Sequence, residues 1–134
     1  MKKTCVLVLA AIFISLNFCQ APGFIETVFN NVEWNDLPGF RQQTQQQIEG
    51  GLWGQSQYYH RQNSPHINFP NVGVTVSYGS REGMIYITNQ QNRLLEYLLL
   101  HEDGSRYLNF LIRPNSQDIV PGNTATVWVR VPNG

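Results

Sequence analysis

The sequence predicts a mainly β domain, an antiparallel β-sandwich or small barrel of about six to eight strands with one short N-terminal helix. Two observations predict it. From Leu52 onward, apolar residues recur with a period of two, and short strand-like segments follow one another at about ten-residue spacing between turn residues. Before Leu52 the period is that of a helix, in a glutamine-rich stretch.

The first element after the leader is a short strand, expected within 27–32, and the second is the helix. Asp36 is the candidate N-cap, and Pro38 suits a first helical turn because its missing N–H has no partner there in any case. Apolar and small side chains follow at helical spacing, and a glycine pair ends the segment: Phe40, Thr44, Ile48 and Gly50-Gly51. The intervening glutamines are expected to face water.

The remaining elements are strands. Their expected positions are one or two strands within 52–61 and 66–69, then 72–78, 84–89, 94–101, 107–113 and 124–131. Asp103-Gly104 is a strong hairpin signal between two of them. The stretch 114–122 is expected to be a loop. The inward residues form the predicted core, namely Val74, Val76, Ile85, Ile87, Leu95, Leu99, Phe110, Ile112, Val127 and Val129.

The N-terminus has the pattern of a secretory signal peptide. Lys2 and Lys3 precede an apolar run over 6–18 that is too short to span a bilayer, and small residues follow it. We therefore expect a signal peptide at 1–21, an N-terminal segment with the glutamine-rich helix at 22–50, and an antiparallel β domain at 51–134. The expected location is extracellular. Cys5 and Cys19 both lie in the leader, so the mature chain has neither disulfides nor thiolate chemistry.

The charge of the mature chain excludes several partners. Without Lys2 and Lys3, seven scattered arginines face nine acidic residues. Binding to a polyanion needs clustered cations, because neutralised phosphates supply most of the affinity. We therefore expect no direct binding to nucleic acid and no attachment to an anionic membrane surface. The mature sequence has no second apolar segment long enough to span a membrane.

Catalytic and metal-binding patterns are sparse. His60 and His66 flank a turn and could hold a metal with Glu49 or Glu102. No helical or tight hairpin spacing supports such a site, so surface histidines are the simpler interpretation. No serine lies in a Gly-x-Ser-x-Gly elbow. Adjacent carboxylates at a hairpin tip more often satisfy turn backbone than face each other across a cleft. We thus expect no catalytic residue, no metal and no cofactor.

Glu96 alternates with leucines, so it is expected to lie inside or at an edge. A buried carboxylate needs a partner, for which Arg113 and Arg106 are the candidates. A structural ion pair is the favoured role.

Aromatic residues are the remaining functional signal. Tyr86 and Trp128 lie on strand faces whose neighbours are polar, so they are the predicted ligand-binding residues, forming an exposed platform that stacks on sugar rings or on a protein. The alternative is that both rings pack in a second layer of the sandwich or under the glutamine-rich helix.

Residues 51–134 resemble the insect multiprotein-bridging-factor type-two family, whose members are often called salivary secreted peptides. The matching features are Gly54 before an aromatic strand, the strands Val74-Thr75-Val76-Ser77-Tyr78 and Ile85-Tyr86-Ile87, a late hairpin at Gly104, and a final strand with Val127, Val129 and Val131. The resemblance implies a secreted arthropod β domain. The family name implies transcriptional co-activation, which conflicts with an export signal.

These observations favour a secreted, non-enzymatic binding protein with a role in interaction or defence, whose ligand is a protein or a glycan. One alternative is a small secreted hydrolase using His101, Glu102 or Asp103. Another is a structural component of a secretion or coat, built on glutamine- and asparagine-rich contacts. A hydrolase is expected to converge polar groups in a concave pocket, whereas a binding module presents aromatics on an open face.

Overall fold

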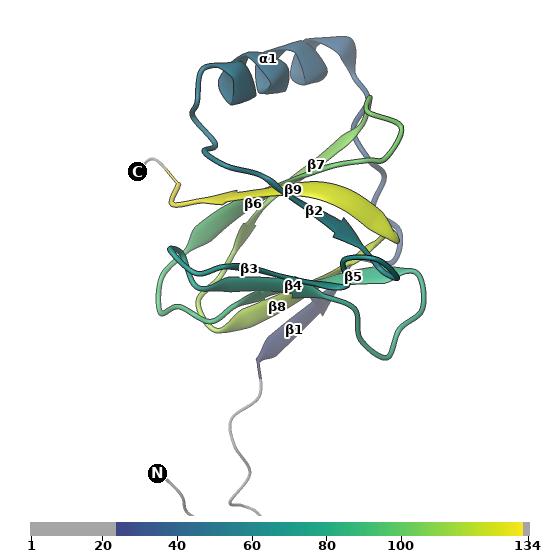
Figure 1. Ribbon diagram of the computed structural model, residues 1–134, viewed down its shortest axis with the longest axis vertical. Coiled ribbons are helices and arrows are strands. Elements are labelled where there is room, and N and C mark those ends of the chain that lie inside the picture. Colours follow the sequence, from purple (N-terminus) through teal and green to yellow (C-terminus); the bar gives the residue numbers. More distant parts are fainter. Residues whose placement is uncertain (1–23, 133–134) are drawn as a thin grey trace, which may run out of the picture.

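The computed structural model describes residues 24–132, so the predicted signal peptide lies outside the described residues. Two β-sheets pack face to face, and one helix lies outside them (Figure 1). The first sheet has the strand order β1 (Ile25–Val28), β8 (Ser116–Pro121), β5 (Met84–Asn89), β4 (Val74–Ser77), β3 (His66–Phe69). The second has the order β2 (Gln57–His60), β9 (Thr124–Arg130), β6 (Leu95–Leu100), β7 (Tyr107–Ile112). The architecture is a sandwich, as predicted, and not a closed barrel.

The described part of the chain contains nine strands, and β8 is the one that the sequence analysis missed. The expectation of a loop over 114–122 is wrong, because Ser116–Pro121 pairs with β5 on one side and with β1 on the other. Polar residues occupy buried positions of this strand: Ser116 and Asp118 are 4% and 5% exposed. Without apolar side chains at these positions, the alternation that marks a strand is absent.

Strand β1 pairs parallel with β8, from Ile25 beside Ser116 to Val28 beside Ile119. All other strand pairs among the described residues are antiparallel. The segment before residue 50 therefore contributes a strand to the five-stranded sheet as well as the helix.

Helix α1 (Pro38–Glu49) covers the outer face of the four-stranded sheet (Figure 1). The predicted N-cap is wrong: Leu37 occupies that position without a side-chain cap, and the Asn35 Oδ1 instead accepts a hydrogen bond from the Leu37 N–H at 3.0 Å. The helix ends before Gly50, as predicted, and Gly51 turns the chain with φ of 79°. Phe40 and Ile48 pack toward the sheet, and Thr44 is 5% exposed.

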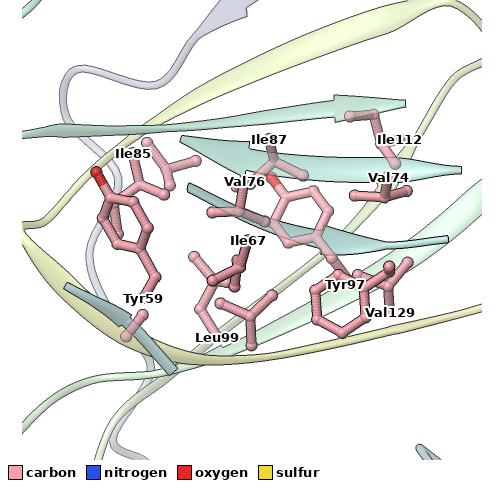
Figure 2. Close-up of a cluster of buried hydrophobic side chains, with 14 of the residues drawn as sticks. Tyr59, Ile67, Val74, Val76, Ile85, Ile87, Tyr97, Leu99, Ile112 and Val129 are labelled. Atoms are coloured by element: carbon pink, nitrogen blue, oxygen red, sulfur yellow. The ribbon is translucent and has the colours of Figure 1, made fainter. Parts of the chain in front are cut away.

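Side chains from both sheets fill the space between them (Figure 2). All of the predicted core residues are buried except Phe110, which is partly buried and stacks on Phe29 with ring centroids 4.7 Å apart. Tyr59 and Tyr97 are also fully buried in this core. The apolar interior confirms the period-two interpretation of the strands.

Candidate functional site

Tyr86 is buried beneath its own hairpin, so the prediction of an exposed ring is wrong. Its side chain is 7% exposed, and its hydroxyl accepts a hydrogen bond from the Arg81 backbone N–H at 3.0 Å. Gly79 lies against the ring: a Cβ at that position would stand 2.5 Å from the Tyr86 Cζ. The turn before β5 thus folds back over the tyrosine and covers its ring.

Trp128 is likewise buried, at 6% exposure, and the platform prediction is wrong for this residue too. It packs with Trp53, Leu98 and Tyr107 under α1, which is the alternative that the sequence left open. The helix thereby buries an aromatic ring whose strand neighbours Thr126 and Arg130 are partly exposed. Neither residue of the predicted ligand site forms an open face.

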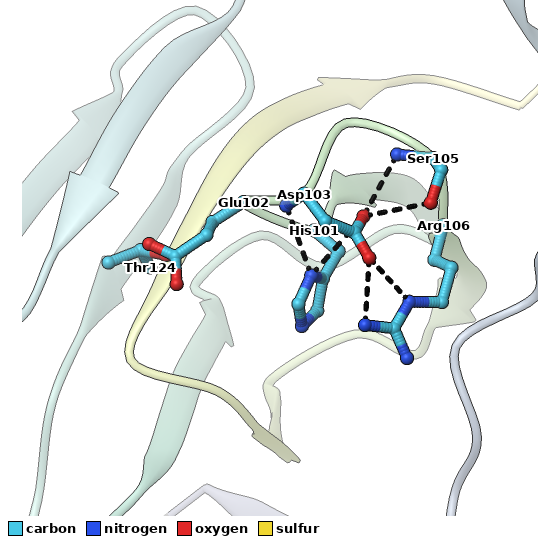
Figure 3. A network of polar contacts seen from close by, with 6 residues as sticks. All are labelled: His101, Glu102, Asp103, Ser105, Arg106 and Thr124. Carbon is cyan, nitrogen blue, oxygen red and sulfur yellow. Dashed lines mark hydrogen bonds and ion pairs between the residues drawn. The ribbon is translucent and has the colours of Figure 1, made fainter.

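The predicted hydrolase residues close the β6–β7 hairpin (Figure 3). The Asp103 Oδ1 accepts hydrogen bonds from the Ser105 N–H at 2.9 Å and the Ser105 hydroxyl at 3.0 Å, while the Oδ2 pairs with Arg106 at 2.8 Å. The His101 Nδ1 accepts the Asp103 N–H at 3.2 Å. Glu102 accepts the Thr124 hydroxyl at 3.3 Å. Each group holds turn backbone or a neighbouring strand.

Hydrogen bonds at the hairpin tip lower the pKa of Asp103. The Ser105 backbone N–H, followed by the side chains of Arg106 and Ser105, holds the pKa of Asp103 below its usual range against a smaller opposing effect of desolvation. A carboxylic acid that donates a proton near neutral pH needs a raised pKa. The geometry therefore gives this cluster a turn-forming role.

The two histidines that flank the β2–β3 turn have different environments. The His60 Nδ1 accepts hydrogen bonds from the backbone N–H groups of Gln62 and Asn63, both at 3.1 Å. In a neutral ring this leaves the proton on Nε2. His66 is exposed on β3 opposite Ser77. Within residues 24–132, no three histidine, cysteine or acidic side chains gather at metal-binding distance.

Glu96 forms the expected ion pair, but with a different arginine. Its Oε1 lies 2.9 Å from the Arg130 Nε, and its Oε2 accepts the Asn109 amide at 3.1 Å. The Arg130 guanidinium also stacks on Trp53, 3.8 Å from the ring centroid. Arg130 lies directly opposite Glu96 in the β6–β9 register, a pairing that becomes visible only once strand partners are known.

One buried polar pair has no signal in the sequence. The Tyr97 hydroxyl donates to the Asp118 Oδ2 at 2.7 Å across the core, linking β6 of one sheet to β8 of the other. Burial raises the pKa of Asp118, and the Tyr97 hydrogen bond and the Arg113 charge partly oppose that rise. Burial also raises the pKa of Tyr97. Both groups lie inside the sandwich, where their role is structural.

An open polar depression of about 760 Å³ lies where three turns meet at one end of the sandwich. The β2–β3, β4–β5 and β8–β9 turns supply its lining residues: His60, Arg61, Gln62, Glu82, Gly83 and Asn123. Backbone hydrogen bonds join these turns, from the Arg61 N–H to the Asn123 carbonyl at 3.0 Å and from the Gly122 N–H to the Gly83 carbonyl at 2.7 Å. The turns that carry these polar side chains are therefore held together by backbone hydrogen bonds.

Two tyrosines that are half exposed adjoin the depression. Tyr78 is 51% exposed, and the Arg61 guanidinium lies 5.7 Å from its ring centroid. Tyr58 is 49% exposed, with its ring 6.3 Å from that of His60. We call the lining residues together with Tyr58 and Tyr78 the turn-end surface. Among the described residues these are the exposed tyrosines, whereas the sequence predicted exposed rings at Tyr86 and Trp128.

The turn-end surface had a partial signal in the sequence. Tyr78 ends the expected strand 72–78, and Tyr58 lies within the expected strand 52–61. Loops at one end of a sandwich often gather into a binding surface. What the sequence lacked was the strand order that brings three separate turns to the same end.

Comparisons with known proteins add no relative. No protein-family model, no curated protein and no solved structure matches the chain. The resemblance to the multiprotein-bridging-factor type-two family stays a prediction. No helix within residues 24–132 has the length and apolar character needed to cross a membrane.

Proposed function

We propose that this chain is an exported, non-enzymatic binding protein that recognises neutral glycans through the turn-end surface. The observation that carries the proposal is the exposure of two tyrosines, Tyr58 and Tyr78, beside an open polar depression between three cross-linked turns. Export rests on the signal-peptide pattern of the first 21 residues.

The chemistry of the lining favours a polyhydroxylated ligand. Gln62 and Asn123 carry amides that both donate and accept, Glu82 accepts, and Arg61 donates. A sugar hydroxyl is both donor and acceptor, so it can pair with each of these groups. The exposed rings of Tyr58 and Tyr78 offer apolar faces against which the C–H face of a sugar ring can stack.

The charge of the surface favours a neutral glycan. One guanidinium, from Arg61, is matched by one carboxylate, from Glu82. A site for sulfated or phosphorylated ligands would cluster cations, as polyanion binding requires. The Arg61 guanidinium also lies over the Tyr78 ring, a contact that orders both side chains before a ligand arrives.

A glycan array of neutral and acidic oligosaccharides tests the proposal, with calorimetry on the strongest binder. We expect neutral glycans to be retained, and we expect Tyr78→Ala and Glu82→Gln each to weaken affinity tenfold or more. Glu49→Gln is the matched control, because Glu49 is an exposed carboxylate at the end of α1 and should bind as the unaltered chain does. Retention of acidic glycans alone, or variants that bind as tightly as the control, would contradict the proposal.

A further inference from the structure

Beyond Tyr107, the outer edge of β7 has no backbone hydrogen-bond partner among the described residues. β7 is the last strand of its sheet, and Tyr107 exchanges two backbone hydrogen bonds with Asn35, at 3.0 and 2.8 Å. Because edge-facing backbone groups recur at every second residue, Asn109 and Leu111 direct theirs to the same side. No backbone hydrogen bond from the described residues reaches them there.

On the other side of the sandwich, one edge-facing residue of β3 and one of β2 have hydrogen-bond partners. On β3, the Asn68 carbonyl accepts a hydrogen bond from the Gln57 side-chain amide. On β2, His60 exchanges two backbone hydrogen bonds with Ser64, at 3.1 and 2.8 Å. An open edge is a template for another strand, and natural proteins usually block it. β7 also exposes an apolar residue, since Leu111 is 56% exposed.

We propose that β7 pairs antiparallel with β7 of a second copy of this chain, about a two-fold axis at Leu111. In this register Leu111 lies beside Leu111 of the second copy, so two exposed leucines are buried in the interface. Asn109 lies opposite the partner's Arg113. A two-fold interface requires a self-complementary surface, and an antiparallel pairing of identical strands satisfies this requirement.

Charge complementarity selects this register. A groove of about 290 Å³ runs beside β7, and Glu33 and Asn109 are among its lining residues. The Asn109 amide nitrogen is used by Glu96 and by the Tyr97 carbonyl, and no donor among the described residues reaches its Oδ1. Glu33 and Arg113 are exposed, and neither forms an ion pair within residues 24–132.

The partner's Arg113 therefore lies near the Glu33 carboxylate and the Asn109 Oδ1. Because of the two-fold symmetry, the same contact occurs twice in the dimer. The ladder ends at Arg113, because its carbonyl already accepts a hydrogen bond from the Asn89 amide at 3.0 Å. The interface is short, so we expect a reversible dimer. A dimer also carries two turn-end surfaces, although the pairing of β7 does not depend on what those surfaces bind.

Sedimentation velocity of the secreted chain over a wide concentration range tests the dimer. We expect a monomer–dimer equilibrium. Leu111→Lys places two like charges beside each other on the axis and should weaken dimerisation tenfold or more. Leu94→Lys is the matched control, because Leu94 is an exposed leucine that precedes β6 and should leave dimerisation unchanged.

Charge reversal tests the register. Glu33→Arg and Arg113→Glu should each weaken the dimer, and the double variant should restore it, because the reversed pair again attracts. The substituted positions are all exposed, namely Glu33, Leu94, Leu111 and Arg113. Circular dichroism checks that each variant is folded. A chain that stays monomeric at every concentration, a dimer that survives Leu111→Lys, or a double variant that is no better than the singles would overturn the proposal.

Discussion

Removal of the Tyr97 hydroxyl tests the link between the two sheets. Tyr97→Phe leaves the ring in place but takes away the 2.7 Å hydrogen bond to the Asp118 carboxylate. A hydrogen bond to a charged group contributes about 1.5–3 kcal/mol. A domain of this size has about 5–15 kcal/mol in total. We therefore expect the free energy of unfolding at pH 7, measured by urea denaturation, to fall by about 1.5–3 kcal/mol.

Tyr59→Phe is the matched control. Both tyrosines are fully buried, but the Tyr59 hydroxyl has no hydrogen-bond partner among the described residues. Its removal leaves no group unsatisfied and should change stability by less than about 0.5 kcal/mol or increase it. A loss equal to that of Tyr97→Phe would mean that ring packing, and not the hydroxyl, is being measured.

The pH dependence gives a second readout. Burial raises the folded-state pKa of Asp118 above its ordinary value near 3.8, so as the pH falls the folded protein takes up this proton before the unfolded chain does. The Asp118 contribution to stability therefore grows as the pH falls from that raised pKa to 3.8, and is lost as the pH rises through it. Asp118→Asn should abolish this term. We therefore compare the loss of unfolding free energy caused by Tyr97→Phe in the unaltered chain and in the Asp118→Asn variant. A hydrogen bond to a neutral amide contributes only about 0.5–1.5 kcal/mol, so the loss should be smaller in the variant. Equal losses would refute the reasoning.

Two further pairs of substitutions test the positions of Trp128 and Tyr86, each with a control. Trp128→Ala should lower the free energy of unfolding by about 3–5 kcal/mol, since the ring is buried under α1, whereas Tyr58→Ala at the exposed tyrosine should change it little; urea denaturation measures both. Gly79→Ala should lower the melting temperature, because its Cβ would collide with the Tyr86 ring, whereas Gly39→Ala, which meets nothing within 4 Å in the first helical turn, should leave it unchanged or raise it.

The period-two pattern of apolar residues predicted most of the strands. The alternation at Val74 and Val76 and at Ile85 and Ile87 comes from one buried face, which is the physical cause of the pattern. It failed at β8, because Asp118 occupies a buried position where the pattern expects an apolar side chain. The Tyr97 hydroxyl on the opposite sheet hydrogen-bonds the carboxylate at that position, and a partner so distant in sequence leaves no local signal.

The exposed aromatic residues are not the ones that the sequence predicted. Polar neighbours on a strand mark a face as solvent-exposed only when nothing else covers it. At Trp128 the helix covers the face, and at Tyr86 the turn containing Gly79 and Arg81 does. Both covers depend on how elements pack, whereas Tyr58 on β2 and Tyr78 directly after β4 stay half exposed.

The parallel pairing of β1 with β8 also constrains how the chain reaches this fold. Ile25 pairs with Ser116, and most of the sequence lies between these two residues. During synthesis, the first strand has no partner until the last quarter of the chain is available. Contacts between such distant residues slow folding, because the entropy of closing the loop is lost before the pairing stabilises anything. The hairpins β3–β4 and β6–β7 are local, so we expect them to form first and the N-terminal strand to dock last.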